Sequence, residues 1–183
     1  MKRFIQTIKN IWSIEDLRKR ILYTLGLVLI YRIGSFVVLP GVDPSQLAGL
    51  QKQGEEGLMG LLNMFSGGAF SNASIFALGI MPYITASIII QLFTMVIPKF
   101  QKLQRDGENG RKKMNQYTRF LTIIVCAFQA PAYITNMRTQ LGASSTAFYP
   151  FDGSAPTLFF WITSIIILIC GTLFVMWLGE RIT

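Results

Sequence analysis

The sequence predicts an all-α membrane protein: a polytopic helical bundle of four transmembrane helices plus one short re-entrant helix. Two observations lead to this fold class. Of the 183 residues, 51% are hydrophobic and only 14% are charged, whereas a soluble domain carries about 25% charged residues. The apolar residues also fall into four runs separated by polar stretches, which is the pattern of membrane spans and not of one large soluble core.

Arg32 in the first predicted span and Pro82 in the second each need an explanation. The spans are residues 21–39, 73–97, 117–137 and 156–178. Arg32 in the first costs about 2.5–3.5 kcal/mol at a helix centre, which the surrounding apolar residues offset. Its side chain either snorkels to the outer interface or makes a polar contact within the membrane. Pro82 is expected to kink the second span, because it removes a backbone hydrogen bond.

The charges between the spans predict the orientation. Residues 1–20 carry six Lys and Arg, and residues 98–119 carry seven, whereas the two intervening connections carry one each. Because basic loops stay in the cytosol, we expect the N-terminus, a basic loop over 98–116 and the residue 183 end to be cytoplasmic. Residues 1–12 have the apolar face and flanking cations of a helix that lies in the membrane interface.

Composition excludes several classes of function. There are no histidines, and both cysteines, Cys126 and Cys170, lie within apolar runs. We therefore expect no catalytic group, no metal site and no cofactor, and hence no enzyme. The net charge of +8 does not predict a nucleic-acid substrate, because no recognition fold accompanies the basic residues.

Two segments do not fit a simple bundle. Residues 58–72 begin with an apolar helical face that is too short to span a bilayer and is broken by Gly67 and Gly68. This helix either re-enters the membrane, where it must be buried in protein or line a cavity, or rests on the outer surface. In the second span, Ile80 and Ile84 share a face with two polar residues. That face either packs against a neighbour or lines a cavity with a hydrophobic constriction.

Four segments resemble the SecY family of protein-conducting channels, and its bacterial form fits best. They are Tyr31-Arg32-Ile33-Gly34-Ser35-Phe36 with Pro40-Gly41-Val42-Asp43; the run from Asn63-Met64-Phe65-Ser66-Gly67-Gly68-Ala69 to Ile88-Ile89-Ile90-Gln91-Leu92; Gly107-Glu108 to Gln116-Tyr117-Thr118-Arg119; and Trp177-Leu178-Gly179-Glu180-Arg181-Ile182-Thr183. The resemblance implies part of the N-terminal half of a ten-helix fold. Four spans in place of ten lead us to expect a truncated chain.

The resemblance also assigns roles to residues. It implies a plug at 58–72 that closes the channel from outside and a hydrophobic pore ring that includes Ile80 and Ile84. The plug residues are Leu61, Leu62, Asn63, Met64, Phe65, Ser66, Gly67 and Gly68. The residues implied at the lateral gate are Thr85, Ser87, Gln91 and Gln129. Those implied for cytosolic docking are Arg105, Arg111, Lys112 and Lys113.

The function implied is that of a pore-forming translocase subunit in the bacterial inner membrane. It would pass unfolded secretory polypeptides and release membrane segments laterally into lipid. The partners implied are SecE and SecG, the motor ATPase SecA or the ribosome, nascent polypeptides with their signal sequences, and anionic lipids. Two alternatives remain: a small-molecule transporter subunit, or a nascent SecY fragment captured during its own insertion. The predicted spans contain no Asp or Glu, which disfavours a transporter with a proton relay.

Overall fold

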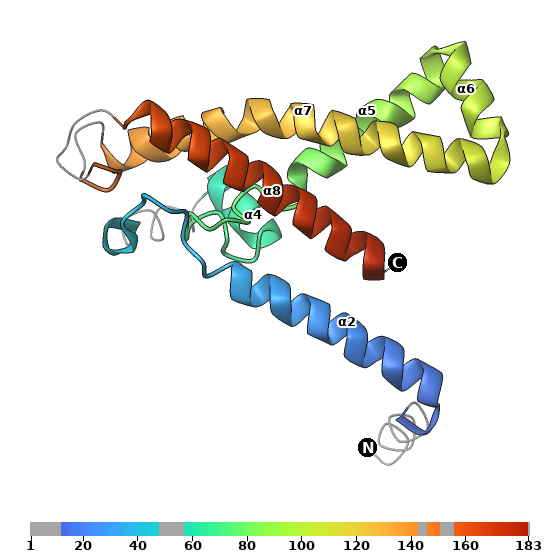
Figure 1. The fold of residues 1–183 in the computed structure, drawn as a ribbon, viewed down its shortest axis with the longest axis horizontal. Helices are drawn as coiled ribbons and strands as arrows, with labels where there is room; N and C mark the ends of the chain where they lie inside the picture. The colour runs from blue at the N-terminus through green and yellow to red at the C-terminus, as the bar shows by residue number, and fades with distance from the viewer. Residues whose placement is uncertain (1–11, 48–56, 143–145, 151–155, 183) are drawn as a thin grey trace.

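The computed structural model describes residues 12–47, 57–142, 146–150 and 156–182, which are mostly helical (Figure 1). The predicted interfacial helix at 1–12 lies outside the described residues, apart from Trp12. The helices are α2 (Glu15–Gly34), the 3-10 helix η1 (Pro44–Leu47), α4 (Gly57–Phe65), α5 (Met81–Val96), α6 (Pro98–Arg105), α7 (Gly107–Leu141) and α8 (Leu158–Ile182).

Helix α7 is the centre of the bundle, with α5 and α8 packed against it, whereas α2 extends away toward the N-terminus (Figure 1). The buried face of α5 repeats every four residues, at Pro82, Ala86, Ile90 and Thr94, as expected for one side of a helix. The main core joins α7 and α8 to the connection after α2, through side chains such as Ile134, Leu168 and Leu39.

Among the described residues, two helices, α7 and α8, are each long and apolar enough to cross a membrane. Helices α5 and α6 meet the same criterion only as a pair, which is bent by 101° at Ile97. Helix α2 does not meet the criterion, because it carries too many charges. Arg18, Lys19 and Arg20 lie near its start, and Arg32 lies in its last turn. It also ends at Gly34, five residues before the predicted end of the first span. Four spans therefore remain a prediction.

The second span differs most from its prediction. The helix does not begin at residue 73 but at Met81, and residues 66–80 form a series of turns. Pro82 lies in the first turn, where its missing N–H costs no hydrogen bond and its fixed φ suits a helix start. Gly79 has φ +53°, outside the helical range. The predicted kink is therefore wrong, because Pro82 begins the helix instead of bending it.

The predicted basic loop at 98–116 is also different, because it is helical over most of its length. Helix α6 and the start of α7 form a hairpin that turns at Gly107, where φ is +66°. Gly110 lies so close to the Leu103 carbonyl that a Cβ would overlap it. The predicted third span is the middle of the 35-residue α7, which continues through Pro131. The helix within the predicted plug is shorter than 58–72, since it ends at Phe65.

The connections at the far end of the bundle are tied together by backbone hydrogen bonds. The Asp43 N–H donates to the Ala147 carbonyl at 2.9 Å, and the Tyr149 N–H donates to the Gly41 carbonyl at 2.9 Å. The Asp43 carboxylate accepts from the N–H of Ser45 at 2.9 Å and from its hydroxyl at 2.8 Å. These bonds to the ionised form lower the pKa of Asp43.

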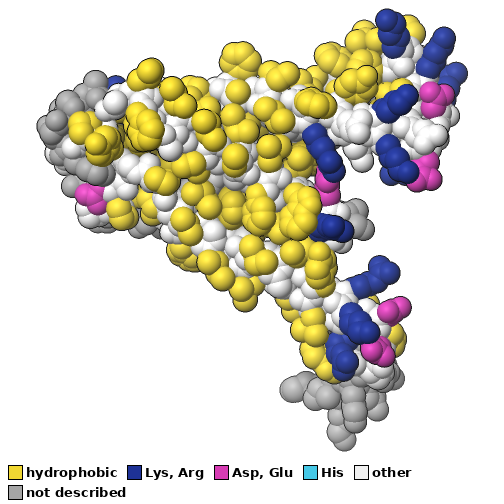
Figure 2. Space-filling model, in the orientation of Figure 1, with side chains coloured by type: hydrophobic (Ala, Val, Ile, Leu, Met, Phe, Trp, Pro, Cys, Tyr) yellow, Lys and Arg dark blue, Asp and Glu magenta, His cyan; other side chains and the backbone are white. Residues whose placement is uncertain are grey.

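Most of the charged side chains visible in Figure 2 lie on one side of the molecule. In the orientation of Figure 2, Lys and Arg cluster at the start of α2, on the α6–α7 hairpin and near the end of α8. Hydrophobic side chains cover most of the remaining visible face. The outward-facing apolar residues include Leu29 and Ile33 on α2, Phe128 on α7 and Phe159 on α8. A soluble monomer seldom exposes so continuous an apolar surface.

Candidate functional site

Residues 66–80, between α4 and α5, cross the interior of the protein without helical structure. Ala69, Ala73 and Ser74 have no exposed surface. The chain reverses directly after α4, at Gly67 (φ +61°) and Gly68 (φ +88°). Irregular backbone at membrane depth is tolerated where it is buried in protein or lines a cavity, and this segment meets the first condition.

Asn63 closes the end of α4. Its backbone carbonyl accepts from the Gly68 N–H at 3.0 Å and from the Ser66 hydroxyl at 3.2 Å. Its side-chain oxygen accepts from the Ser71 N–H at 3.3 Å. The Ser66 hydroxyl in turn accepts from the Phe70 N–H at 3.1 Å. The polar side chains of this stretch thus satisfy a backbone that cannot use helical hydrogen bonds.

Three side chains from other helices fasten the same segment. The Tyr31 hydroxyl of α2 donates to the Ser66 carbonyl at 2.9 Å. Arg32 Nη1 donates to the Gly67 carbonyl at 2.7 Å. The Tyr133 hydroxyl of α7 donates to the Phe70 carbonyl at 2.8 Å. Arg32 therefore makes a polar contact with the protein backbone while its side chain is exposed, and its depth in the membrane stays a prediction.

A row of aromatic rings packs beside these hydrogen bonds. Phe76 stacks on Tyr31 with ring centroids 5.6 Å apart and on Phe174 of α8 at 5.8 Å. Two glycines make the close packing possible. A Cβ at Gly34 would overlap the Phe76 ring, and a Cβ at Gly171 would overlap the Ile75 carbonyl. The buried segment is thus held between the end of α2 and the middle of α8.

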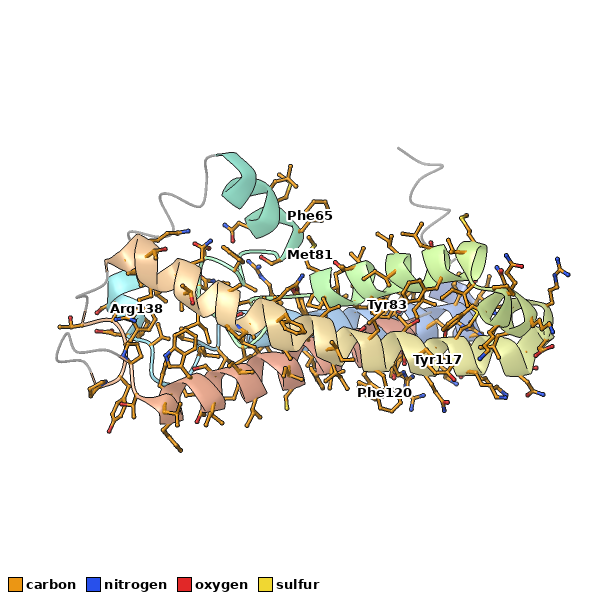
Figure 3. The ribbon with its side chains drawn as sticks, turned by 90° about the horizontal axis from the view of Figure 1, so that it is seen from above. Phe65, Met81, Tyr83, Tyr117, Phe120 and Arg138 are labelled. Atoms are coloured by element: carbon orange, nitrogen blue, oxygen red, sulfur yellow. The ribbon has the colours of Figure 1, made fainter. Side chains whose placement is uncertain are left out.

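An apolar cavity of about 230 Å³ lies where α4, α5 and α7 meet. Its lining includes Phe65 at the end of α4, Ile80 and Ile84 at the start of α5, and Gln129 on α7. In Figure 3, Phe65 and Met81 lie next to each other at this junction. The structure therefore brings together residues for which the family resemblance implies separate roles in plug, ring and gate.

A second cavity, of about 580 Å³, is lined by the same two isoleucines. Its lining is more polar and includes Asn115, Arg119 and Glu180. Arg119 and Glu180 form a two-point ion pair, with Nε to Oε1 at 3.1 Å and a short Nη2 to Oε2 contact. Ile80 and Ile84 thus line both the apolar cavity, which also includes Phe65, and the more polar cavity, which also includes Arg119 and Glu180.

Helix α4 itself is less packed than the segment that follows it. Leu61, Met64 and Phe65 are 53%, 83% and 66% exposed, and Figure 3 shows α4 standing away from the other helices. The side chain of Leu62 lies outside the described residues. The plug assignment therefore stays a prediction. The structure shows that α4 is loosely packed and that the reversal after it, at Gly67 and Gly68, is held by hydrogen bonds. We call this reversal the hinge.

The predicted gate residues are not gathered at one place. Gln129 lines the apolar cavity, whereas Thr85, Ser87 and Gln91 line neither of the two cavities described. The Thr85 hydroxyl donates to the Met81 carbonyl of its own helix at 3.0 Å. Ser87 is half-buried and Gln91 is exposed on α5. Their role at a lateral gate stays a prediction.

The predicted docking residues share the α6–α7 hairpin. Arg105 ends α6, whereas Arg111, Lys112 and Lys113 lie in the first two turns of α7, and all four are exposed. Lys112 pairs with Glu108 at 3.1 Å. The hairpin is braced from within by Phe100, whose ring lies 5.9 Å from Phe93 and 5.7 Å from Tyr117. It thus presents these cations on a defined helical surface.

Sequence reasoning missed Tyr31, Tyr133 and the Arg119–Glu180 pair. Their partners lie 35, 63 and 61 residues away in the chain, so no local pattern reveals them. One signal was present for the tyrosines. A hydroxyl in an apolar helix needs a hydrogen-bond partner within the protein.

The sequence is similar to known proteins of one family. Residues 74–183 match the SecY family model. The chain is 45% identical, over 93% of its length, to the protein translocase subunit SecY of Escherichia coli K12 and to that of Buchnera aphidicola subsp. Acyrthosiphon kondoi. It is 46% identical, over 92% of its length, to the subunit of Streptomyces scabiei.

The chain covers 37%, 46% and 39% of the length of these three relatives, respectively. It therefore corresponds to less than half of each, and the sequence resemblance to this family is confirmed over that portion. Since the family model matches more than half of the chain, the protein belongs to the SecY family of helical membrane proteins.

Proposed function

We propose that this chain forms one wall of a protein-conducting channel. The channel passes unfolded secretory polypeptides across the membrane and releases membrane segments laterally into lipid. The relatives are described as protein translocase subunits, which supports a role in translocation. The observation that carries the proposal is the position of Ile80 and Ile84, which line both the apolar cavity and the more polar cavity.

A narrow ring of apolar side chains can close a pore by excluding water, because a thin water column is unstable between them. Ile80 and Ile84 supply part of such a ring. The end of α4 adds a second closure, since Phe65 faces the same cavity as the two isoleucines. Residues 58–72 act as the plug on the outer side, and a translocating chain displaces them.

The remaining walls of the channel come from outside this chain, which covers 37–46% of the length of the relatives named above. Energy comes from a cytosolic partner, because the wall itself carries out no chemistry. The proposed partners are SecE and SecG in the membrane, SecA or the ribosome in the cytosol, and anionic lipids around them. The face with Thr85, Ser87, Gln91 and Gln129 borders the lateral gate.

We place the protein in the bacterial inner membrane with four spans, formed around α2, α5, α7 and α8. The N-terminus and the residue 183 end are cytoplasmic in this arrangement. The support is the clustering of Lys and Arg at one side, seen in Figure 2, together with the retention of basic segments in the cytosol. The polar cavity with Arg119 and Glu180 then opens toward the cytosol.

The experiment is site-specific photocrosslinking in a full-length translocase subunit that carries this segment. A crosslinker at Ile84 is expected to react with a polypeptide stalled in the channel. The same crosslinker at Phe128, which is 78% exposed on α7, is expected to react with lipid. Equal crosslinking of the stalled polypeptide from both positions would contradict the proposal.

Neutralising the hairpin tests the docking role. Changing Arg105, Arg111 and Lys113 to Gln is expected to weaken SecA binding about tenfold at low salt, because each exposed charge contributes about 0.5 kcal/mol. The difference should vanish near 1 M salt, where the Debye length is about 3 Å. Arg138→Gln, at the opposite end of α7 in Figure 3, is the control. Unchanged affinity of the triple variant at low salt would exclude the hairpin as a docking site.

A further inference from the structure

The two peptide units that follow α4 are held by side chains of α2. Tyr31 donates to the Ser66 carbonyl at 2.9 Å and Arg32 donates to the Gly67 carbonyl at 2.7 Å. Both acceptors lie directly at the reversal made by Gly67 and Gly68, whose positive φ angles suit glycine. Any swing of α4 about this reversal turns these two carbonyls, so it must break both hydrogen bonds.

The Tyr31 hydroxyl is held in place by its ring. The ring stacks on Phe76 at 5.6 Å with an interplanar angle of 7°, and Phe76 is buried between α2 and α8. Arg32 also contacts the Phe36 ring, with its guanidinium carbon 4.9 Å from the ring centroid. These ring contacts hold both donor side chains in place independently of the hydrogen bonds, which lowers the loss of side-chain entropy when each bond forms.

A third bond lies on the other side of the reversal. Tyr133 donates to the Phe70 carbonyl at 2.8 Å, two residues beyond Gly68. The segment after that point is mostly buried, and its backbone pairs with the connection after α2, from the Leu39 N–H to the Ala73 carbonyl at 2.8 Å. Helix α4 moves as one piece only if the chain pivots before Phe70. The Tyr133 bond then stays intact during the movement.

We propose that Tyr31 and Arg32 are positioning residues that latch the plug closed, whereas Tyr133 anchors the fixed side of its hinge. The inference rests on the proposed function and deepens it by assigning the residues that set the resting position. The latch is short and polar, and α4 has few other contacts, with Met64 83% exposed. Loss of either latch bond therefore shifts the equilibrium toward the displaced plug.

The test measures resting ion leak through the complete channel, assembled from the full-length chain with its partner subunits in proteoliposomes. Tyr31→Phe keeps the ring stack and removes only the hydroxyl. It is expected to raise the leak about 5- to 10-fold, which is the ratio lost with one hydrogen bond. Arg32→Gln is expected to raise the leak by at least as much, because its bond is charge-assisted. Arg32→Lys keeps a charged donor and is expected to restore most of the closure.

Tyr133→Phe and Tyr23→Phe are the matched controls. Tyr133→Phe also loses one tyrosine hydrogen bond but should lower thermal stability without changing the leak, because its bond lies beyond the pivot. Tyr23, an exposed residue of α2, should change neither quantity. An unchanged leak in Tyr31→Phe, or an equal rise in Tyr133→Phe, overturns the latch.

Deletion of residues 57–65 distinguishes a failure of the proposed latch from a failure of the plug assignment. If the deletion raises the leak and Tyr31→Phe does not, the latch is wrong while the plug stands. If the deletion leaves the leak unchanged, the plug assignment fails and the latch fails with it. A rise in both, with Tyr133→Phe unchanged, supports the latch.

Discussion

Replacing Gly171 of α8 with alanine is expected to destabilise the protein by about 3 kcal/mol, at the upper end of the cost of overpacking. A Cβ at this position would overlap the Ile75 carbonyl and lie 3.3 Å from Phe76 Cδ1. A flexible side chain could rotate away, but a backbone carbonyl within a buried turn segment cannot. The helix must move outward, and the Phe76–Phe174 stack at 5.8 Å is then lost.

The measurement is thermal unfolding of the full-length protein in detergent, followed by intrinsic fluorescence. Gly26→Ala in α2 is the matched control, because a Cβ there meets no atom within 4 Å. This control should gain up to about 1 kcal/mol from better helix propensity. An equal melting temperature for Gly171→Ala and the wild type would show that α8 does not press on the turn segment.

The sequence alone predicts the elements that local pattern determines. Helix α8 follows from one uninterrupted apolar run, and its observed range, Leu158–Ile182, differs from the predicted 156–178 by a few residues at each end. The mostly helical architecture follows from the same apolar runs. The sequence predicted a loop in place of the α6–α7 hairpin because most residues of this stretch are polar. Tertiary contacts that no local pattern reveals, such as Gly110 packed against the Leu103 carbonyl, accompany its helical structure.

The start of α5 shows why other elements could not be predicted. A proline inside an apolar run is compatible both with a kinked helix and with a helix start. The choice is made by hydrogen bonds from a distant segment, such as the Ile75 N–H to the Val37 carbonyl at 3.0 Å. These bonds offer residues 66–80 an alternative to the helix. Such pairing depends on the tertiary fold and leaves no local pattern.

The candidate site divides in the same way. The spacing of Ile80 and Ile84 places them on one helical face, and the resemblance to the family added Gln129; the structure places all three on one cavity. The groups that hold the site together were not predictable. Tyr133 and Phe70 are 63 residues apart, and Arg119 and Glu180 are 61 residues apart.

Changing Ile84 to Asn is expected to raise the resting ion leak of the full-length channel by about 10- to 100-fold. The substitution removes an apolar side chain worth roughly 1.5–3 kcal/mol in transfer free energy, and 1.4 kcal/mol corresponds to tenfold. Ile84 touches both cavities, so a hydrated amide there lets water connect them. The leak is measured by ion flux in proteoliposomes without substrate.

Two variants separate this constriction from general damage to α5. Ile84→Leu keeps the volume and apolar character, so its leak should stay near the wild-type value. Ile88→Asn makes the same chemical change one turn further along, at a residue that lines neither cavity, and its leak should also stay low. If Ile88→Asn leaks as much as Ile84→Asn, the effect comes from a weakened helix. A leak confined to Ile84→Asn instead identifies the narrow point as the place where the two cavities meet.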